Sequence, residues 1–223
     1  MLPLGFTAFL AFGVVLVLLG ASQADLAEAL SLDLARSGLL GSVLALGIGV
    51  GVVGAGPLFD RYPRRHELAR RSARRLGLKN LRCEPRDALR PLRGLSETPF
   101  DRVLVDVPCS GLGTLRRNPD ARWRVGPDDP ARLAEIQRQI LANAAECLRP
   151  GGVLVYSTCT VLHEENQAVV ESFLSSRDDF VACPASRLPE EVRDVVGSDG
   201  YLHTLPHLHD MDGFFAARLV RRT

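Results

Sequence analysis

Two long uncharged runs near the amino terminus most constrain what this chain can fold into. Residues 2–24 and residues 37–59 each contain 23 consecutive residues without a charged side chain. A helix that crosses a bilayer needs about 20 predominantly apolar residues. Each run is therefore predicted to form a transmembrane helix. Four charged residues separate the two runs, namely Asp25, Glu28, Asp33 and Arg36.

Arginines directly after the second run orient the predicted helix hairpin. Arg61, Arg64 and Arg65 are expected on the cytoplasmic side of the membrane, where positive charge is retained. Both ends of the hairpin then face the cytoplasm. This predicts a domain over 1–60 that anchors a cytoplasmic domain over 61–223 to the membrane through residues 2–59. If the amino-terminal segment is a fusion artefact, the second domain is expected to be simply cytoplasmic.

The second run also carries glycines at the spacing of a dinucleotide-binding loop. Gly49, Gly51 and Gly54 form the pattern G-x-G-x-x-G. That fingerprint requires a strand before it and an amphipathic helix after it, whereas here it lies in continuous apolar sequence. Close packing of membrane helices explains these glycines better. Residues 1–65 resemble the first two helices of a major facilitator transporter, and G-P-L-F-D-R-Y-P-R-R over 56–65 resembles its following loop.

Charge and cysteine content narrow the function classes. Residues 61–149 carry 20 basic and 11 acidic side chains, a net charge of +9. Such a segment is typical of a surface that binds a polyanion such as RNA, although a solvated arginine-rich face would have the same composition.

The five cysteines include no C-x-x-C pair, so a zinc ribbon is not predicted. Their odd number favours a reducing compartment.

Beyond residue 60, patterns typical of strands and helices alternate. Strands are predicted over 100–106, 153–157 and 214–220, and helices over 66–76, 130–148 and 163–174. Pro130 is typical of a first helical turn, and Thr160 is a candidate cap for the last helix. The alternation predicts an α/β domain with a largely parallel sheet. In such sheets, ligands bind beyond the carboxyl ends of the strands.

Two cysteine loops follow the predicted central strands. One reads Asp106-Val-Pro-Cys109-Ser and the other Ser157-Thr-Cys159-Thr. A thiolate can add to carbon 6 of a pyrimidine, which lets carbon 5 attack an activated methyl group, while a carboxylate near ring nitrogen 3 stabilises the developing charge. A second thiol can assist release. Partial exposure near the basic segment is expected to favour thiolate. The remaining cysteines, Cys83, Cys147 and Cys183, are predicted to pack in the core.

These loops resemble those of the Sun/RsmB-type RNA cytosine-5 methyltransferases. The similarity extends over residues 60–223 and is carried by F-D-R-V-L-V-D-V-P-C-S-G-L-G-T-L-R-R-N-P-D-A-R-W-R, L-R-P-G-G-V-L-V-Y-S-T-C-T, E-E-N and D-G-F-F-A-A-R-L. The resemblance implies a partial Rossmann-like methyltransferase fold. It also implies S-adenosylmethionine as cofactor and RNA, specifically small-subunit ribosomal RNA, as partner and substrate.

The same resemblance implies roles for individual residues. Cys159 matches the nucleophile and Cys109 the cysteine that assists release. Asp106 matches an acid between cofactor and target base, and Asp87 an acid near the adenine. Asp60, twelve residues before the helix motif that begins at Ser72, matches the acid that binds the ribose hydroxyls.

One family motif has no counterpart in this chain. The glycine-rich loop that cradles the methionine end of the cofactor, D-x-C-A-A-P-G-G-K-T, is absent, as are the amino-terminal RNA-binding regions. The sheet is therefore expected to lose a central strand, which a membrane helix could not replace. The alternative hypothesis is a non-catalytic fusion or remnant that binds RNA, or a membrane-anchored passenger domain.

Other polar clusters receive weaker predictions. Arg116, Arg117, Arg122 and Arg124 form a candidate RNA-binding set, with Trp123 interpreted as a structural tryptophan beneath solvated arginines. His203, His207 and His209 lack further ligands at suitable spacing, so no metal site is predicted. Glu164 and Glu165 are interpreted as favourable charges in a first helical turn.

Overall fold

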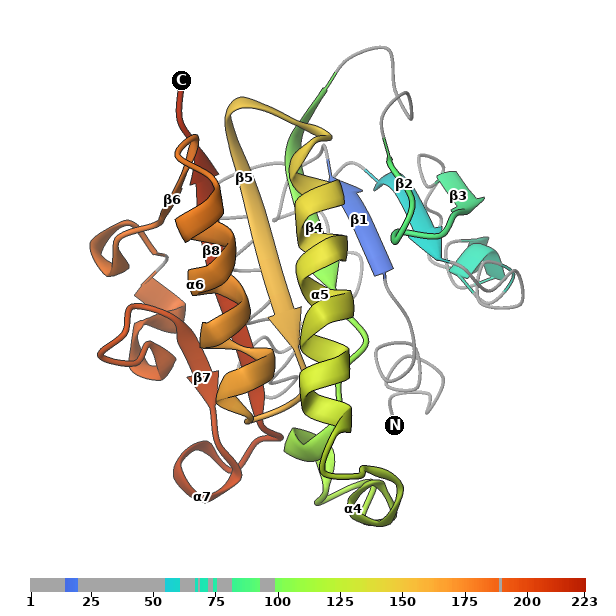
Figure 1. The fold of residues 1–223 in the computed structure, drawn as a ribbon, viewed down its shortest axis with the longest axis vertical. Coiled ribbons are helices and arrows are strands. Elements are labelled where there is room, and N and C mark those ends of the chain that lie inside the picture. The colour runs from blue at the N-terminus through green and yellow to red at the C-terminus, as the bar shows by residue number, and fades with distance from the viewer. Residues whose placement is uncertain are drawn as a thin grey trace.

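The computed structural model describes residues 15–19, 55–60, 67, 69–71, 74–75, 82–92, 99–188 and 190–223. Its framework is an eight-stranded sheet in the order β3-β2-β1-β4-β5-β8-β6, with β7 paired to β8 (Figure 1). The strands are β1 (Val15–Leu19), β2 (Ala55–Asp60), β3 (Arg82–Pro85), β4 (Phe100–Asp106), β5 (Leu148–Thr158), β6 (Phe180–Ala182), β7 (Leu202–Thr204) and β8 (Phe214–Arg221). Outside the 66–76 segment, the helices of the described residues are α4 (Ala121–Arg124), α5 (Asp129–Ala145), α6 (Gln167–Ser176) and α7 (Pro206–His209).

The parallel pair β4 and β5 forms the middle of the sheet. Asp106 lies opposite Ser157 in this pair, so the two strands end side by side. The predicted strand over 100–106 is confirmed with the same bounds. The strand predicted over 153–157 is part of the longer β5, because the helix predicted over 130–148 ends earlier: α5 ends at Ala145 and β5 begins at Leu148.

Alternating side chains of the central strands form two cores, one on each face. Val105, Tyr156 and Phe215 belong to the larger core beneath α5 and α6, which lie side by side on one face of the sheet (Figure 1). Their neighbours Val155 and Ala216 belong to the smaller core on the opposite face. The two-residue period therefore matches a sheet covered on both faces.

Strand β1 occupies the position that sequence analysis expected to be empty. It pairs with β2 on one side and β4 on the other, and it is antiparallel to both. The expectation that the sheet loses a central strand was therefore wrong, because the apolar run supplies one. The expectation of a largely parallel sheet is met only in part. All strands except β1 and β8 run the same way, but these two lie between other strands, so only the pairs β2–β3 and β4–β5 are parallel.

The structure contradicts the predicted transmembrane helices where it describes them. Residues 15–19 lie within the predicted span 2–24 and form a strand, and residues 55–59 lie within the predicted span 37–59 and belong to a strand that continues to Asp60. The other residues of both spans lie outside the described ranges, as does the boundary of a separate domain over 1–60, apart from Asp60. No helix in the described part of the chain is long and apolar enough to cross a membrane. Long apolar runs also suit central strands, and length alone did not distinguish the two.

The remaining predicted elements are found with shifted details. The described residues of the predicted helix over 66–76 are helical. The predicted helix over 163–174 is a short 3-10 turn, His163–Glu165, followed by α6. Thr160 does not cap α6; its hydroxyl oxygen accepts a hydrogen bond from the backbone N–H of Leu162 at 3.3 Å. The predicted strand over 214–220 is confirmed as β8.

Candidate active site

The two cysteine loops meet at the carboxyl end of the central strand pair. Cys109 Sγ lies 3.3 Å from Cys159 Sγ, and the backbone N–H of Cys159 donates to Cys109 Sγ at 3.3 Å. Both thiols are free and half-buried. The structure therefore joins two motifs that are 50 residues apart in sequence into one partly exposed thiol pair.

Backbone hydrogen bonds hold the two cysteine loops together and bind the segment around Gly213 to them. The N–H of Gly113 donates to the carbonyl of Cys159 at 3.0 Å, and the N–H of Gly213 donates to the carbonyl of Gly113 at 2.7 Å. A Cβ atom at Gly113 would lie 1.9 Å from the Gly213 carbonyl oxygen. Only glycine permits this approach, so three chain segments are held at fixed separations around the thiols.

Asp106 is the carboxylate nearest in sequence to Cys109, and it is poorly solvated. Its Oδ1 accepts a hydrogen bond from the Ser157 hydroxyl at 3.2 Å, while Oδ2 is buried without a hydrogen-bond partner in the described part of the chain. Burial raises the pKa of Asp106 to about 7, against a smaller lowering by the Ser157 hydrogen bond. At neutral pH the group can therefore either donate or accept a hydrogen bond.

This perturbed carboxyl predicts a pH-dependent stability. The native state retains a proton that the unfolded chain, with an ordinary pKa of 3.8, releases. Stability should therefore fall as pH rises from about 4 to about 7, by at most about 4 kcal/mol from this group. In urea denaturation at a series of pH values, Asp106→Asn should flatten this decline and Asp178→Asn, at an exposed carboxylate, should not. Equal profiles for the two variants would refute the prediction.

The Cys109 thiol is held in its neutral form. Its hydrogen bond with Cys159, followed by burial, raises the pKa of Cys109 well above its usual value. The negative charge of Glu165 acts in the same direction. The expectation that the basic segment favours thiolate was therefore wrong for Cys109, because the contacts that raise its pKa come from Cys159, burial and Glu165.

Glu165 belongs to the site and supports its structure. From the sequence, this residue was interpreted only as a favourable charge in a first helical turn. It is fully buried, and its Oε2 accepts hydrogen bonds from the backbone N–H of Ser110 and from Gln137 Nε2, both at 2.9 Å. The Tyr156 hydroxyl donates to the Glu165 carbonyl at 2.6 Å. Glu165 thus connects the Cys109 loop to α5 and β5. The E-E-N motif was the available signal for this role.

Loss of this carboxylate should destabilise the fold. Glu165→Ala would leave the buried Ser110 N–H without its acceptor and would remove one of the two acceptors of Gln137 Nε2, which would keep its bond to the Pro108 carbonyl, at a cost of about 2–4 kcal/mol. Thermal and urea denaturation should show this loss for Glu165→Ala. Glu164→Ala, at the exposed neighbouring position, should change stability by less than about 0.5 kcal/mol. Similar stabilities for both variants would contradict the assigned role.

Three predicted cofactor-binding acids lie at the same end of the sheet. Asp60 is the last residue of β2 and aligns with Pro85 of the parallel strand β3. Asp87 follows β3, and its Oδ1 accepts from the backbone N–H of Leu89 at 3.1 Å. Asp106 ends β4. At this end of the sheet, the buried Asp106 oxygen without a partner among the described residues fits a hydroxyl or ammonium donor such as those of S-adenosylmethionine.

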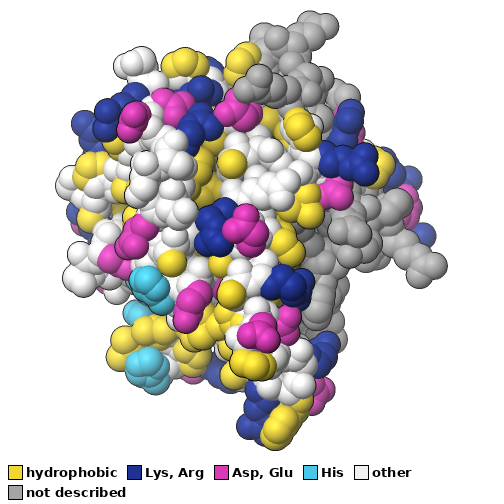
Figure 2. Space-filling view, in the orientation of Figure 1, with side chains coloured by type: hydrophobic (Ala, Val, Ile, Leu, Met, Phe, Trp, Pro, Cys, Tyr) yellow, Lys and Arg dark blue, Asp and Glu magenta, His cyan; other side chains and the backbone are white. Residues whose placement is uncertain are grey.

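The four candidate arginines separate into two pairs. Arg116 donates to Asp210 Oδ1 at 2.6 Å, and Arg117 is paired with Asp212. Arg122 instead stacks on Trp123, with its guanidinium carbon 4.7 Å from the ring centroid. On the face shown in Figure 2, basic side chains are interspersed with acidic ones. The described residues of the +9 segment therefore form no continuous basic surface on this face.

Several other predictions can be compared with the structure. Trp123 is 77% exposed, so its interpretation as a structural tryptophan was wrong. Cys83, Cys147 and Cys183 are buried, which confirms the prediction that they pack in the core. His203 contacts Asp199 at 2.8 Å. The described residues contain no group of three or more His, Cys, Asp or Glu side chains that could hold a metal ion.

Comparison with known families identifies the chain. The model of the 16S rRNA methyltransferase RsmB/F family matches residues 53–220. The chain belongs to this family. RsmB/F membership agrees with the resemblance carried by the two cysteine motifs, and the matched region begins within the second apolar run. The matches described here lend no support to a transporter-like segment over residues 1–65.

Individual relatives of the RsmB/F family support the same assignment. The chain is 42% identical over 165 residues to the Bacillus subtilis protein named "Probable ribosomal RNA small subunit methyltransferase B", covering 73% of this chain and 37% of that protein. It is 39% identical over 166 residues to ribosomal RNA small subunit methyltransferase B of Thermus thermophilus, covering 73% and 38%. The chain thus spans less than two fifths of these relatives.

Solved structures establish the fold. PH0851 superposes with a TM-score of 0.66 at 33% identity, covering 72% of this chain and 35% of that one. NSun6 from Pyrococcus horikoshii with SFG superposes with a TM-score of 0.62 at 28% identity, covering 74% and 41%. The α/β fold is therefore of the Rossmann-like methyltransferase type.

Proposed function

We propose that this chain contains the catalytic module of an RNA cytosine-5 methyltransferase that acts on small-subunit ribosomal RNA. The observation that carries this proposal is the 3.3 Å contact between the Cys109 and Cys159 thiols, next to the buried Asp106 carboxyl at the carboxyl end of β4. The RsmB/F family is S-adenosylmethionine-dependent, and the names of the relatives supply the RNA class.

Cys159 begins the proposed reaction. Its thiolate sulfur forms a bond to carbon 6 of the cytosine, and the electrons of the carbon 5–carbon 6 double bond move to make carbon 5 nucleophilic. Bound S-adenosylmethionine supplies an electrophilic methyl group to that carbon. Asp106, with its pKa raised to about 7, hydrogen-bonds near ring nitrogen 3 and stabilises the charge that develops on the ring.

Cys109 assists the second half of the reaction. After carbon 5 is methylated, solvent water, which reaches the partly exposed thiol pair, takes the proton from carbon 5. The electron pair of that C–H bond re-forms the carbon 5–carbon 6 double bond, and the bond between carbon 6 and Cys159 breaks so that the thiolate leaves. The raised pKa keeps Cys109 a thiol whose sulfur lies within contact of Cys159. A neutral partner at this distance can hydrogen-bond to the departing thiolate, which makes release easier.

The three acids would hold the cofactor. Asp87 is assigned to the adenine, Asp60 to the ribose hydroxyls, and Asp106 to the region between cofactor and base. Carboxylates accept hydrogen bonds from hydroxyl and amine donors, which is the chemistry these positions require. Attachment to a membrane through residues 2–59 is not part of this proposal, because residues 15–19 and 55–60 form strands.

Transfer of a labelled methyl group tests the proposed function. The full chain, purified in detergent, should transfer the methyl group of S-adenosylmethionine to carbon 5 of a cytosine in small-subunit ribosomal RNA. Calorimetry should show cofactor binding that Asp87→Asn and Asp106→Asn weaken, and that Asp178→Asn does not. Absence of both cofactor binding and methyl transfer would refute the proposal.

The reversed direction of β1 favours a second candidate. A strand that runs towards the carboxyl end of the sheet delivers its following loop to the cofactor, but antiparallel β1 ends at the opposite side, with Leu18 paired to Val103. The second candidate is a module that binds RNA without catalysis. It predicts RNA binding that weakens steeply with salt, together with no affinity for S-adenosylmethionine.

A further inference from the structure

Exposed apolar side chains gather at one end of the molecule. Within the described part of the chain, the exposed large hydrophobic residues are Trp123, Val161 and Leu208. Trp123 lies in α4, Leu208 lies in α7, and Val161 follows Cys159 by two residues. Helices α4 and α7 both lie at the end of the sheet towards which β5 points (Figure 1). The apolar exposure therefore surrounds the end that carries the thiol pair.

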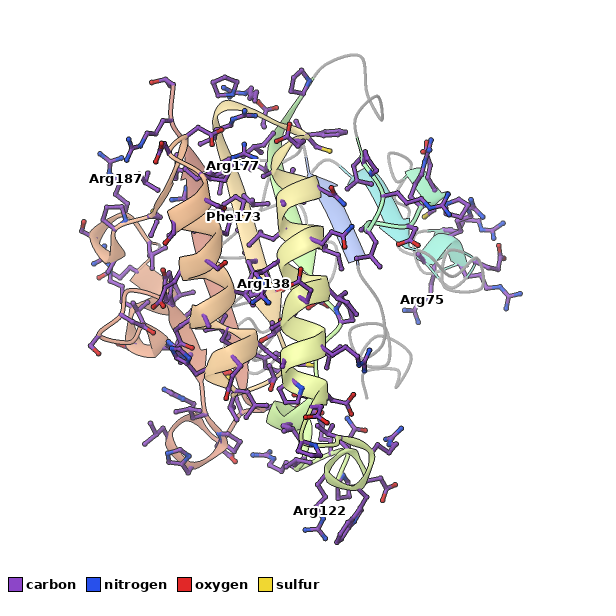
Figure 3. All side chains as sticks on the ribbon, viewed as in Figure 1. Arg75, Arg122, Arg138, Phe173, Arg177 and Arg187 are labelled. Atoms are coloured by element: carbon purple, nitrogen blue, oxygen red, sulfur yellow. The ribbon has the colours of Figure 1, made fainter. Side chains whose placement is uncertain are left out.

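Trp123 is the most exposed of the three, and a contact orients its ring. With 77% of its surface accessible, the side chain contributes little to the core. The guanidinium of Arg122 lies over the ring at 4.7 Å, which restricts the indole without covering most of it. Figure 3 places Arg122 at the tip of α4, away from the sheet. An exposed indole held in this way is available for stacking.

The ion pairs determine which arginines can bind a further anion. Arg116 and Arg117 are paired with Asp210 and Asp212, so their charge is largely compensated. Arg122 and Arg124 are exposed and make no ion pair in the described part of the chain. The two uncompensated guanidinium groups flank Trp123 on both sides in sequence.

Short turns connect α4 to the loop that carries Cys109 and Gly113. The N–H groups of Arg117 and Asn118 donate to the carbonyl of Thr114 at 2.9 and 2.8 Å, and Ala121 N–H donates to the Asn118 carbonyl at 3.1 Å. These turns begin directly after Gly113, which is bonded to Cys159. The position of Trp123 is therefore tied to the thiol pair through short, hydrogen-bonded turns.

We propose that α4 is a stacking platform for unpaired RNA next to the target cytosine. A base stacks on Trp123, while Arg122 and Arg124 contact the neighbouring phosphates. This inference rests on the proposed function and specifies how its substrate is held. Tryptophan and arginine also occur together at protein interfaces, but uncompensated positive charge on both sides of the ring favours a polyanion.

Fluorescence offers a direct test because Trp123 is the only tryptophan in the chain. The detergent-purified full chain is titrated with a short single-stranded RNA that contains cytosine, and with an RNA of the same length whose bases are removed. Stacking should quench the fluorescence with the first RNA and not with the second. By anisotropy of labelled RNA, Trp123→Ala should weaken binding about 5- to 150-fold, and Trp123→Phe should restore most of it.

A charge variant tests the phosphate contacts separately. Arg124→Gln should lower the slope of log affinity against log salt by about 0.7 for a single-stranded RNA. Arg187→Gln, at an exposed arginine that Figure 3 places far from α4, should leave the slope unchanged. Equal slopes for the two variants would remove the phosphate contact from the proposal.

The outcomes separate the platform from the proposed reaction. RNA binding without quenching, with wild-type affinity in Trp123→Ala, would overturn the platform even if methyl transfer is observed. Quenching specific to base-containing RNA would sustain the platform even if no methyl transfer is detected. Self-association that Trp123→Ala abolishes, with no response to RNA, would assign the indole to a protein contact and also overturn the proposal.

Discussion

Replacing Cys159 with alanine should abolish methyl transfer, lowering its rate by about 10⁴-fold or more, because the proposed reaction begins with a bond between the Cys159 sulfur and carbon 6. Replacing Cys109 should have a different consequence. The Cys109→Ala chain should still attack cytosine but release the product slowly, so RNA should remain covalently attached. Denaturing gels of the full chain with labelled RNA would show a retarded band for Cys109→Ala and none for Cys159→Ala.

The contrast between the two variants is the critical result. Cys183→Ala, at a buried cysteine in the core of the opposite face, controls for general loss of a thiol. It should retain methyl transfer and show no retarded band. If Cys109→Ala lost attachment and Cys159→Ala retained it, the two roles would be reversed. If neither cysteine affected methyl transfer, the thiol pair would have no part in the chemistry.

Gly113→Ala should be among the most destabilising single substitutions in this protein. The added Cβ would lie 1.9 Å from the Gly213 carbonyl oxygen and 2.8 Å from the Cys159 carbonyl oxygen. Backbone atoms on two segments would have to move, and the hydrogen bonds from Gly113 and Gly213 would be lost with them. We expect a loss of about 3 kcal/mol in the free energy of unfolding, measured by urea denaturation.

Gly126 provides the matched control. A Cβ atom there would meet Asp129 Oδ2 at 3.6 Å, an ordinary van der Waals contact, and its backbone needs no left-handed conformation. Gly126→Ala should therefore change stability by less than about 1 kcal/mol. A loss for Gly113→Ala no greater than that of the control would mean that the loops can separate at little cost. The thiol contact would then not depend on this approach.

Much of the central sheet could be predicted from local patterns. The run F-D-R-V-L-V-D combines alternation, β-branched residues and a terminal acid, and it forms β4 with the expected bounds. Helix α5 has proline in its first turn, as expected. These elements obey local rules because their own side chains determine both their conformation and the face they bury.

Contacts between distant segments were not predictable in the same way. A buried acceptor such as Glu165 and a charge at the start of a helix look alike in sequence, because the difference lies in Ser110, 55 residues away. The exposure of Trp123 also depends on what the fold leaves uncovered. The amino-terminal apolar runs were misinterpreted because a chain segment that suits lipid also suits the centre of a sheet covered on both faces.

The central place of β1 has a practical consequence for producing this protein. Its apolar sequence invites removal when a shorter chain is prepared for experiments. Because β1 pairs with both β2 and β4, its removal would leave unpaired N–H and C=O groups along the edges of β2 and β4. Such edges pair with strands of other chains, so a shortened chain that begins at residue 55 should aggregate instead of gaining solubility.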